Sequence, residues 1–241
     1  MAAVTLGGLT GGGGRLLGPM VAERLASDYV DRIILTKAAR EIGSTVEALH
    51  QREQRLPTFG EQIRRVVQQI LERSAVSSAS ADPYFGSGTM AFLTKEFEDL
   101  EQPIITRGHE VEEAAYHQAL RKTMNELASA GNVVIVGRGG SIILRDDPTV
   151  LRVGVVAEIE DRIERIMDRE RLSHDEAARV VENRDLARAI YFKNHFGLED
   201  PDDPQLYQLV INSSEMDLEY AAEVVVNARK ALDKGCLRRK L

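Results

Sequence analysis

The sequence predicts an α/β fold in which a parallel sheet is wrapped by helices and interrupted by one helical insertion. Three observations support this fold class. The chain opens with a short apolar run, a glycine-rich loop and an amphipathic helix. Continuous runs of β-branched residues recur after residue 130, and such runs are typical of strands buried on both faces of a sheet. Between these parts, residues 36–130 carry mostly helical periodicity.

The N-terminal elements are predicted as strand, loop, helix and strand. Residues Ala3–Leu6 are apolar and stop at two glycines, as a strand that enters a loop does. From Leu16 onward, apolar residues recur at the one-face spacing of a helix. Tyr29 and Val30 indicate a short second strand.

The insertion is predicted from its helical signals. Residues 33–74 contain two S/T-x-x-E capping boxes, which mark helix starts. Residues 75–89 are rich in serine, alanine and glycine, and these predict a loop. A further amphipathic helix is expected from about Glu110 to Ala130, where Gly131 would end it.

Strands and helices alternate in the rest of the chain. The predicted strands are Val133–Val136, Leu151–Val156 and Leu209–Ile211. The predicted helices begin near Ile159, at the capping box formed by Ser173 and Glu176, and at Asp217.

Composition limits the class of protein. With 241 residues, 43% of them hydrophobic and 29% charged, the chain has enough apolar material for a core. The formal net charge of -7 argues against a nucleic acid polymer as partner. No apolar run approaches the roughly 20 residues of a membrane helix. The start of the chain lacks the pattern of a signal peptide, and Cys236 has no second cysteine to pair with. We therefore expect a cytoplasmic protein that does not enter membranes.

The glycine loop is the first candidate site. Glycines allow positive φ and turn successive backbone N–H groups toward one anion, and the following helix start adds favourable partial charge. Against the phosphate-loop pattern G-x-x-x-x-G-K-[ST], Gly8 and Gly13 match. Gly14 stands at the lysine position and Arg15 at the position of the magnesium-binding hydroxyl. A plain flexible turn is the alternative. The candidate phosphate-binding residues are Gly8, Thr10, Gly11, Gly12, Gly13, Gly14 and Arg15.

Arginines that follow strands or share helix faces form the second candidate site. Arg138 follows a buried strand, at the edge where parallel sheets place ligand contacts. Arg162 and Arg165 share one helix face, and Arg184 and Arg188 lie on the next helix with Asp185. Guanidinium groups suit phosphoryl oxygens. For Arg162 and Arg165 the alternative is a solvated face, paired with acidic residues of their own helix.

Six segments of the chain occur in the order found in one kinase family. They are VTLGGLTGGGGR, DYVDR, VVIVGRGG, AEIEDRIERI, ENRDLAR and LVINSS. With them, the chain resembles the cytidylate kinase-like branch of the nucleoside monophosphate kinases over nearly its whole length. The resemblance implies a P-loop-type parallel five-stranded sheet, a helical insertion and an arginine-bearing helical lid near residues 160–200. It also implies a single domain over 1–241, with residues 1–35 and 131–241 as the core and 36–130 as the insertion.

The resemblance further implies roles for the candidate residues. Gly8 to Arg15 would hold the β-phosphate of ATP, and Arg138 would contact the acceptor monophosphate. Arg162 and Arg165 would lie at the lid over the transferring phosphoryl group.

Two more groups take their expected roles from the family. Arg184 and Arg188 would contact phosphate, and Asp185 the acceptor sugar. Asp31 and Arg32 match a pair that the family places near the acceptor and the metal. The implied reaction is ATP-dependent phosphoryl transfer to a nucleoside monophosphate, most similar to cytidylate, with ATP and Mg²⁺ as cofactors.

The chain departs from the family pattern in the loop and the lid. Gly7 and Gly8 stand where the family often has a Ser-Arg pair, and residues 189–192 are less polar than the usual lid. These departures leave two alternatives: a non-catalytic nucleotide-binding sensor or partner-binding protein, and a kinase for a non-nucleotide acceptor. The sequence also leaves open the direction of Arg15, and whether the insertion binds acceptor or forms a homo-oligomer surface.

Three other polar groups predict no site. His109, His117 and His195 lack metal-ligand spacing, so no metal site is expected. Asp200, Asp202 and Asp203 are expected in an exposed turn, and a cation site is the alternative. Ser213 follows a strand without the motif of a nucleophile.

Overall fold

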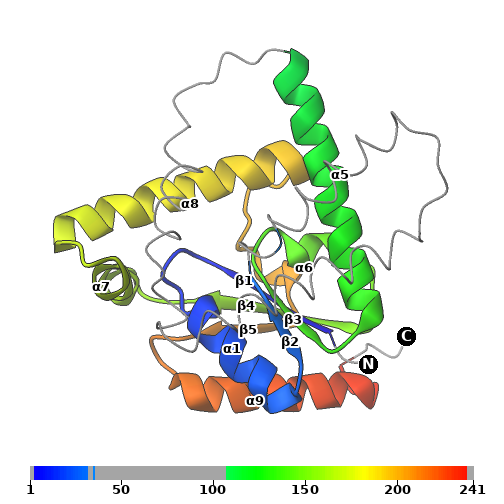
Figure 1. Cartoon of the computed structure of the whole chain (residues 1–241). Coiled ribbons are helices and arrows are strands. Elements are labelled where there is room, and N and C mark those ends of the chain that lie inside the picture. The colour runs from blue at the N-terminus through cyan, green and yellow to red at the C-terminus, as the bar shows by residue number, and fades with distance from the viewer. Residues whose placement is uncertain (1–2, 32–34, 36–106, 238–241) are drawn as a thin grey trace, which may run out of the picture. The chain divides into compact units, whose positions relative to one another are not determined.

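The computed structural model describes residues 3–31, residue 35 and residues 107–237 (Figure 1). The expected helices within residues 33–74, the expected loop at 75–89 and Arg32 lie outside the described residues. The chain divides into two compact units, Met1–Arg32 with Ala128–Leu241, and Ile33–Leu127. The whole sheet belongs to the first unit.

Five parallel strands form the sheet, as predicted. Their order is β2-β3-β1-β4-β5, and every neighbouring pair is parallel. The strands are β1 (Ala3–Gly8), β2 (Asp28–Val30), β3 (Val133–Val136), β4 (Val150–Val156) and β5 (Leu209–Asn212). Because β1 is flanked by β3 on one side and β4 on the other, the loop after β1 opens at the point where the strand order reverses, and open α/β sheets bind ligands at this point.

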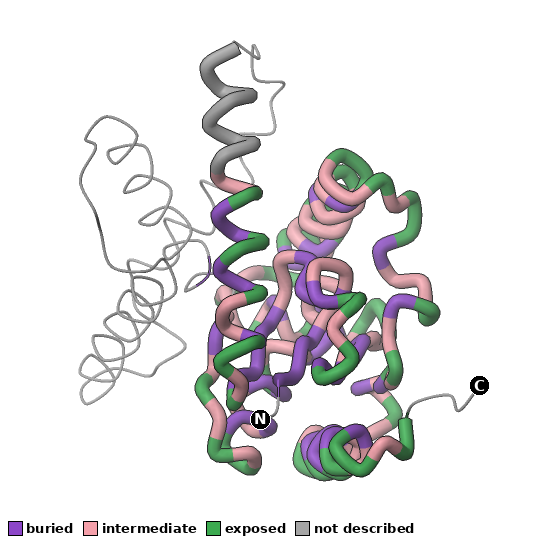
Figure 2. Tube along the Cα trace, turned by 90° about the vertical axis from the view of Figure 1, so that its right-hand side faces the viewer, coloured by how far each residue is buried: buried purple, intermediate pink, exposed green. Residues whose placement is uncertain are grey.

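One face of the sheet is covered by α1 (Gly14–Leu25) and α9 (Leu218–Asp233). Leu17 and Val21 of α1 pack with Val4, Val153 and Val225 in one buried cluster. Figure 2 shows the buried residues of α9 along one side of the helix. Burial of these aliphatic side chains, at about 25 cal/mol per Å², stabilises the layer that carries the glycine loop.

Two helices, α7 (Ile159–Glu170) and α8 (His174–Phe196), lie between β4 and β5 in the chain. They pack together through a small buried cluster that includes Ile166 and Val181. The predicted capping box opens α8, since the Glu176 carboxylate accepts hydrogen bonds from both the backbone N–H and the hydroxyl of Ser173 (2.9 and 2.6 Å).

One strand runs further than the sequence predicted, and two short helices were not predicted. β1 does not stop at Leu6, because Gly7 and Gly8 continue the parallel ladder opposite Gly154 and Val155. The short helix α6 (Gly140–Ile143) was not predicted, since four residues carry no helical period. The short 3-10 helix η1 (Pro204–Leu206) was not predicted either.

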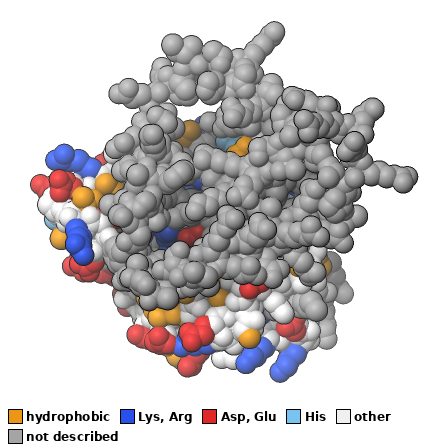
Figure 3. Space-filling model, viewed as in Figure 1, with side chains coloured by type: hydrophobic (Ala, Val, Ile, Leu, Met, Phe, Trp, Pro, Cys, Tyr) orange, Lys and Arg blue, Asp and Glu red, His pale blue; other side chains and the backbone are white. Residues whose placement is uncertain are grey.

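The helix α5 (Arg107–Ala130) ends at Gly131, as expected, where φ is 75°. Among the described residues, no helix combines the length and the apolar character that crossing a membrane requires. On the face shown in Figure 3, acidic and basic side chains of the described residues are mixed.

Candidate functional site

The glycine loop joins β1 to α1 through Leu9–Gly13. Gly11 and Gly13 have positive φ values of 76° and 92°, which side chains rarely tolerate. A Cβ atom at Gly11 would lie 2.5 Å from the backbone oxygen of Arg162, so α7 approaches the loop too closely for any other residue. The N–H of Gly12 donates to the oxygen of Leu9 (3.0 Å) and closes the turn.

Three successive carbonyl oxygens of the loop accept hydrogen bonds from residues outside it. Nε of Arg162 donates to Thr10 O (2.8 Å), Nη1 of Arg165 to Gly11 O (3.1 Å), and the hydroxyl of Ser213 to Gly12 O (2.8 Å). These peptide bonds are trans, so each carbonyl and the N–H that follows it point in opposite directions. The N–H groups of residues 11–13 therefore point away from these donors.

The start of α1 adds further donors to the same region. Its N-cap is Gly13, and among the described residues no side chain caps it and no acidic residue occupies its first turn. The first N–H groups of a helix have no intrahelical acceptor and carry partial positive charge. Gly14 leaves room beside them, because an added Cβ would meet, among the described residues, only Val155 Cγ2, at 3.9 Å. This part of the loop fits a phosphate group.

Arg15 points toward the end of β2. Its Nη2 lies 3.3 Å from Oδ2 of Asp31, and the Arg15 side chain is 36% exposed while that of Asp31 is 13% exposed. The Arg15 side chain, whose direction the sequence left open, therefore points toward Asp31. The family resemblance implied that Asp31 lies near the acceptor and the metal.

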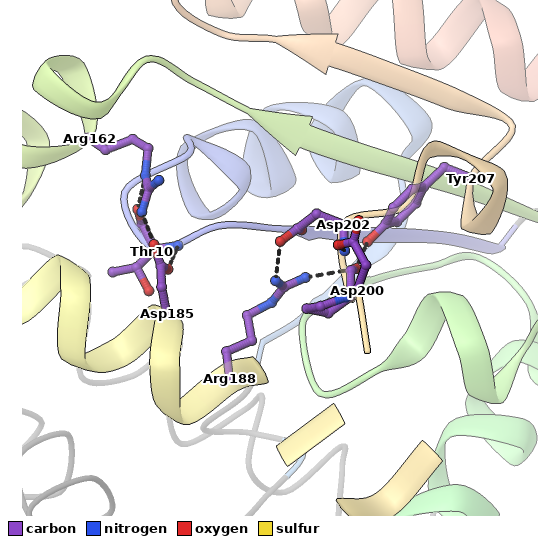
Figure 4. Close-up of polar contacts among 8 residues, drawn as sticks. Thr10, Arg162, Asp185, Arg188, Asp200, Asp202 and Tyr207 are labelled. Carbon is purple, nitrogen blue, oxygen red and sulfur yellow. Dashed lines mark hydrogen bonds and ion pairs between the residues drawn. The ribbon is translucent and has the colours of Figure 1, made fainter. Parts of the chain in front are cut away.

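Asp185 lies against the glycine loop. Its Oδ1 accepts a hydrogen bond from the backbone N–H of Thr10 (3.0 Å), and its Oδ2 pairs with Nη2 of Arg162. Arg162 from α7 and Asp185 from α8 point toward each other at Thr10 (Figure 4). The Arg162 side chain is only 7% exposed, so this ion pair and its two loop contacts form a largely buried network that ties both helices to the loop.

Arg184 is held by a carboxylate that sequence reasoning missed. The side chain of Glu170, 5% exposed, accepts two hydrogen bonds from Arg184 (2.5 and 3.0 Å) and one from Arg169 (2.5 Å). Burial alone would raise the pKa of Glu170, but the hydrogen bonds from Arg184 and Arg169 outweigh it, so the pKa is lowered. No sequence spacing signals this pair, because it depends on how α8 folds back on α7.

Arg188 pairs with the acidic turn that follows α8. It donates to Asp202 Oδ2 (2.6 Å) and to the backbone oxygen of Pro201 (3.2 Å), and its guanidinium lies 4.8 Å from the centre of the Phe192 ring. Residues 200–203 form a turn, as predicted, in which Asp200 accepts from the N–H of Asp202 (2.8 Å), but the Asp202 side chain is only 24% exposed. Asp202 was not expected to hold Arg188 (Figure 4).

Arg138 occupies the turn after β3 in a left-handed conformation, with φ of 53°. Its guanidinium carbon lies 5.9 Å from the centre of the Tyr191 ring, within cation–π range. Tyr191 packs edge-on against Phe192, the residue beneath Arg188. Arg138 and Arg188 are thus joined through two aromatic rings of α8.

The structure brings some predicted residues together and keeps others apart. Arg162, Arg165 and Asp185 meet at Thr10–Gly12 of the glycine loop. Arg184 is held by Glu170 instead, and Arg15 reaches Asp31. Within the part of the chain that the structure describes, no group of three or more His, Cys, Asp or Glu residues could hold a metal ion.

Known proteins resemble this chain in sequence and in fold. A cytidylate kinase from Methanocaldococcus jannaschii is 32% identical over 111 residues, which are 45% of this chain and 62% of the relative. A cytidylate kinase from Pyrococcus horikoshii is 34% identical over 109 residues, 45% of this chain and 55% of the relative. The matches thus span less than two thirds of either relative.

In fold, the chain is similar to an uncharacterized protein from Eubacterium ventriosum. The TM-score is 0.61 at 14% identity, and the match covers 96% of this chain and 99% of the other. The model of the Cytidylate kinase-like family matches residues 3–215, which include the whole sheet, the glycine loop and the α7–α8 pair. This chain belongs to the cytidylate kinase-like family.

Proposed function

We propose that this protein transfers a phosphoryl group from ATP to a nucleoside monophosphate, with a cytidylate-like acceptor. The observation that carries the proposal is the orientation of the glycine loop, whose carbonyl oxygens are held on one side so that the N–H groups of Gly11 and Gly13 point to the other. The uncapped start of α1 completes this donor set. Family membership supports the reaction class.

Phosphoryl transfer requires positioning and charge stabilisation more than covalent help from the protein. The N–H groups of Gly11 and Gly13 and those at the start of α1 would hold the phosphates of ATP, and Arg138 would bind the acceptor phosphate. Arg184 and Arg188 are paired with Glu170 and Asp202, so a phosphate must compete with a carboxylate for either guanidinium.

Mg²⁺ would be held mainly by the nucleotide. Mg²⁺ keeps several of its waters and binds through one or two carboxylates plus substrate phosphates, so it needs no cage of protein ligands. Asp31 follows β2 at the same edge of the sheet as the glycine loop, and its pairing with Arg15 would have to adjust for it to reach a metal-bound water.

The test is a coupled assay of ADP release with ATP, Mg²⁺ and a panel of CMP, dCMP, UMP, AMP and GMP. Arg138→Ala should lower acceptor-dependent kcat/KM by about 10²- to 10³-fold, the range for loss of one donor that stabilises transition-state charge. Arg171→Ala is the matched control, because Arg171 also has a left-handed backbone (φ of 55°) but is exposed at the end of α7. Unchanged acceptor kinetics in Arg138→Ala would remove Arg138 from the site.

A second candidate function is a nucleotide sensor without turnover. Gly14 supplies no side chain at the lysine position, and Arg15 is engaged with Asp31. Such a protein would bind ATP in calorimetry yet release no ADP with any of the five monophosphates.

A further inference from the structure

We propose that Ser213 is a positioning residue for the glycine loop, and that it acts together with Arg165. This inference rests on the proposed function, because it assigns how the loop is held ready for the phosphates of ATP.

Ser213 is the first residue beyond β5, and it is buried with 5% exposure. Its backbone N–H donates to Val156 O (2.8 Å), which extends the β4–β5 ladder by one residue and fixes where the side chain begins. The hydroxyl donates to Gly12 O (2.8 Å), with Val156 O farther away at 3.2 Å. The sheet therefore places a hydroxyl donor directly behind the loop.

Arg165 completes the contact from α7. Its Nη1 donates both to the Ser213 hydroxyl oxygen (2.9 Å) and to Gly11 O (3.1 Å), and its Nη2 donates to the backbone oxygen of Ser213 (2.9 Å). The hydroxyl thus accepts from Arg165 while it donates to Gly12. The Ser213 side chain therefore joins the sheet, α7 and the loop. We call this set of contacts the Ser213–Arg165 brace.

The brace sets which way two peptide units of the loop face. Glycine has access to both positive and negative φ, so a run of glycines between residues 11 and 14 has little preference of its own. With Gly11 O and Gly12 O held, the two peptide units are fixed: the N–H of Gly12 donates to Leu9 O, and the N–H of Gly13 must point away from Ser213. Without the brace, the loop would become ordered only when the phosphate binds, and the conformational entropy lost in that step would weaken binding.

This assignment changes the expected role of Arg165. The family resemblance implies that it lies over the transferring phosphoryl group, whereas its three contacts here are all to the loop and to Ser213. An arginine that positions the loop affects phosphate binding through Gly11 and Gly12, and its effect must depend on Ser213.

The experiment measures binding of ATP and of inorganic tripolyphosphate by calorimetry, together with the KM values for ATP and acceptor. Ser213→Ala should weaken binding of both probes by about tenfold, equivalent to about 1.4 kcal/mol, and raise the KM for ATP by a similar factor. The acceptor KM should stay unchanged. Ser213→Thr, which keeps the hydroxyl, should restore affinity.

The matched control is Ser214→Ala. The Ser214 hydroxyl accepts from the N–H of Glu158 (2.8 Å), at the start of α7, rather than binding a carbonyl oxygen of the loop. This variant should bind both probes as the wild type does. Thermal unfolding of all variants shows whether Ser213→Ala is folded; if it is not, Arg165→Met tests the same brace from α7.

A double-mutant cycle distinguishes positioning from direct contact. In the brace, Ser213→Ala and Arg165→Met remove parts of one unit, so the double variant should bind tripolyphosphate about as weakly as either single variant. Additive losses, or wild-type affinity in Ser213→Ala, would overturn the proposal. If no acceptor supports ADP release while Ser213→Ala still weakens ATP binding, the brace stands and the kinase function falls. A wild-type chain that binds neither probe would overturn both.

Discussion

Gly8→Ala is expected to lower the free energy of unfolding by about 2–6 kcal/mol, which is a large part of the roughly 5–15 kcal/mol that stabilises an ordinary domain. Gly8 has φ of 146°, a conformation that costs a residue with a side chain about 1–3 kcal/mol. A Cβ atom there would also lie 2.0 Å from the backbone oxygen of Val155. That oxygen belongs to β4, which pairs with β1 inside the sheet, so relief of the clash must separate two strands, at a further cost of about 1–3 kcal/mol.

Gly14→Ala is the matched control for this prediction. Among the described residues, a Cβ atom at Gly14 would meet only Cγ2 of Val155, at the ordinary contact distance of 3.9 Å, so stability should change little. Urea denaturation followed by circular dichroism measures both variants. If Gly8→Ala unfolded at the same urea concentration as the wild type, the close approach of β1 to β4 described above would be wrong.

Glu170→Gln is expected to destabilise the α7–α8 pair by about 3 kcal/mol. This is the lower end of the range for breaking a buried ion pair, and we choose it because Arg169 is partly exposed. A neutral amide leaves the guanidinium groups of Arg184 and Arg169 without the carboxylate that both now share. The exposed Glu164 of the same helix provides the control, since Glu164→Gln should leave stability nearly unchanged.

The effect of Glu170→Gln should also depend on pH. The pKa of Glu170 is lowered in the folded protein from its usual value of 4.5, so the carboxylate binds fewer protons in the folded chain than in the unfolded chain below that pH. Its contribution is therefore fully present above pH 4.5 and is lost as the pH falls through the folded-state pKa. The difference in unfolding free energy between wild type and variant should be constant from about pH 8 to about pH 5 and shrink in stronger acid. A constant difference at all pH values would contradict the ion-pair assignment.

The strands that are continuous apolar runs could be predicted from the sequence. β3 has the predicted bounds, Val133–Val136, because four β-branched residues in a row fit a strand buried on both sides. β1 was predicted two residues short, since glycines normally mark a turn. Here Gly7 and Gly8 stay in the ladder, where Gly7 leaves room for the Tyr207 ring.

Only some residues of the candidate site could be predicted from the sequence. Arginine is the residue that suits phosphate, so Arg138, Arg162 and Arg165 could be selected by type and spacing. Their partners could not be selected, because Glu170 and Asp202 become neighbours of Arg184 and Arg188 only after α8 folds back. Ser213 was considered only as a nucleophile, and the sequence carries no mark of a hydroxyl that binds a backbone oxygen.

The contact between Asp185 and Thr10 uses the backbone N–H of Thr10 rather than its side chain. Any residue except proline can therefore make this contact at position 10, because proline alone has no N–H to donate. A relative with proline here must hold the corresponding carboxylate by another donor. Across a family, proline at the position of Thr10 should therefore occur together with a new hydrogen-bond donor near the carboxylate. This covariation links α8 to the loop, and a comparison of side-chain types alone would not reveal it.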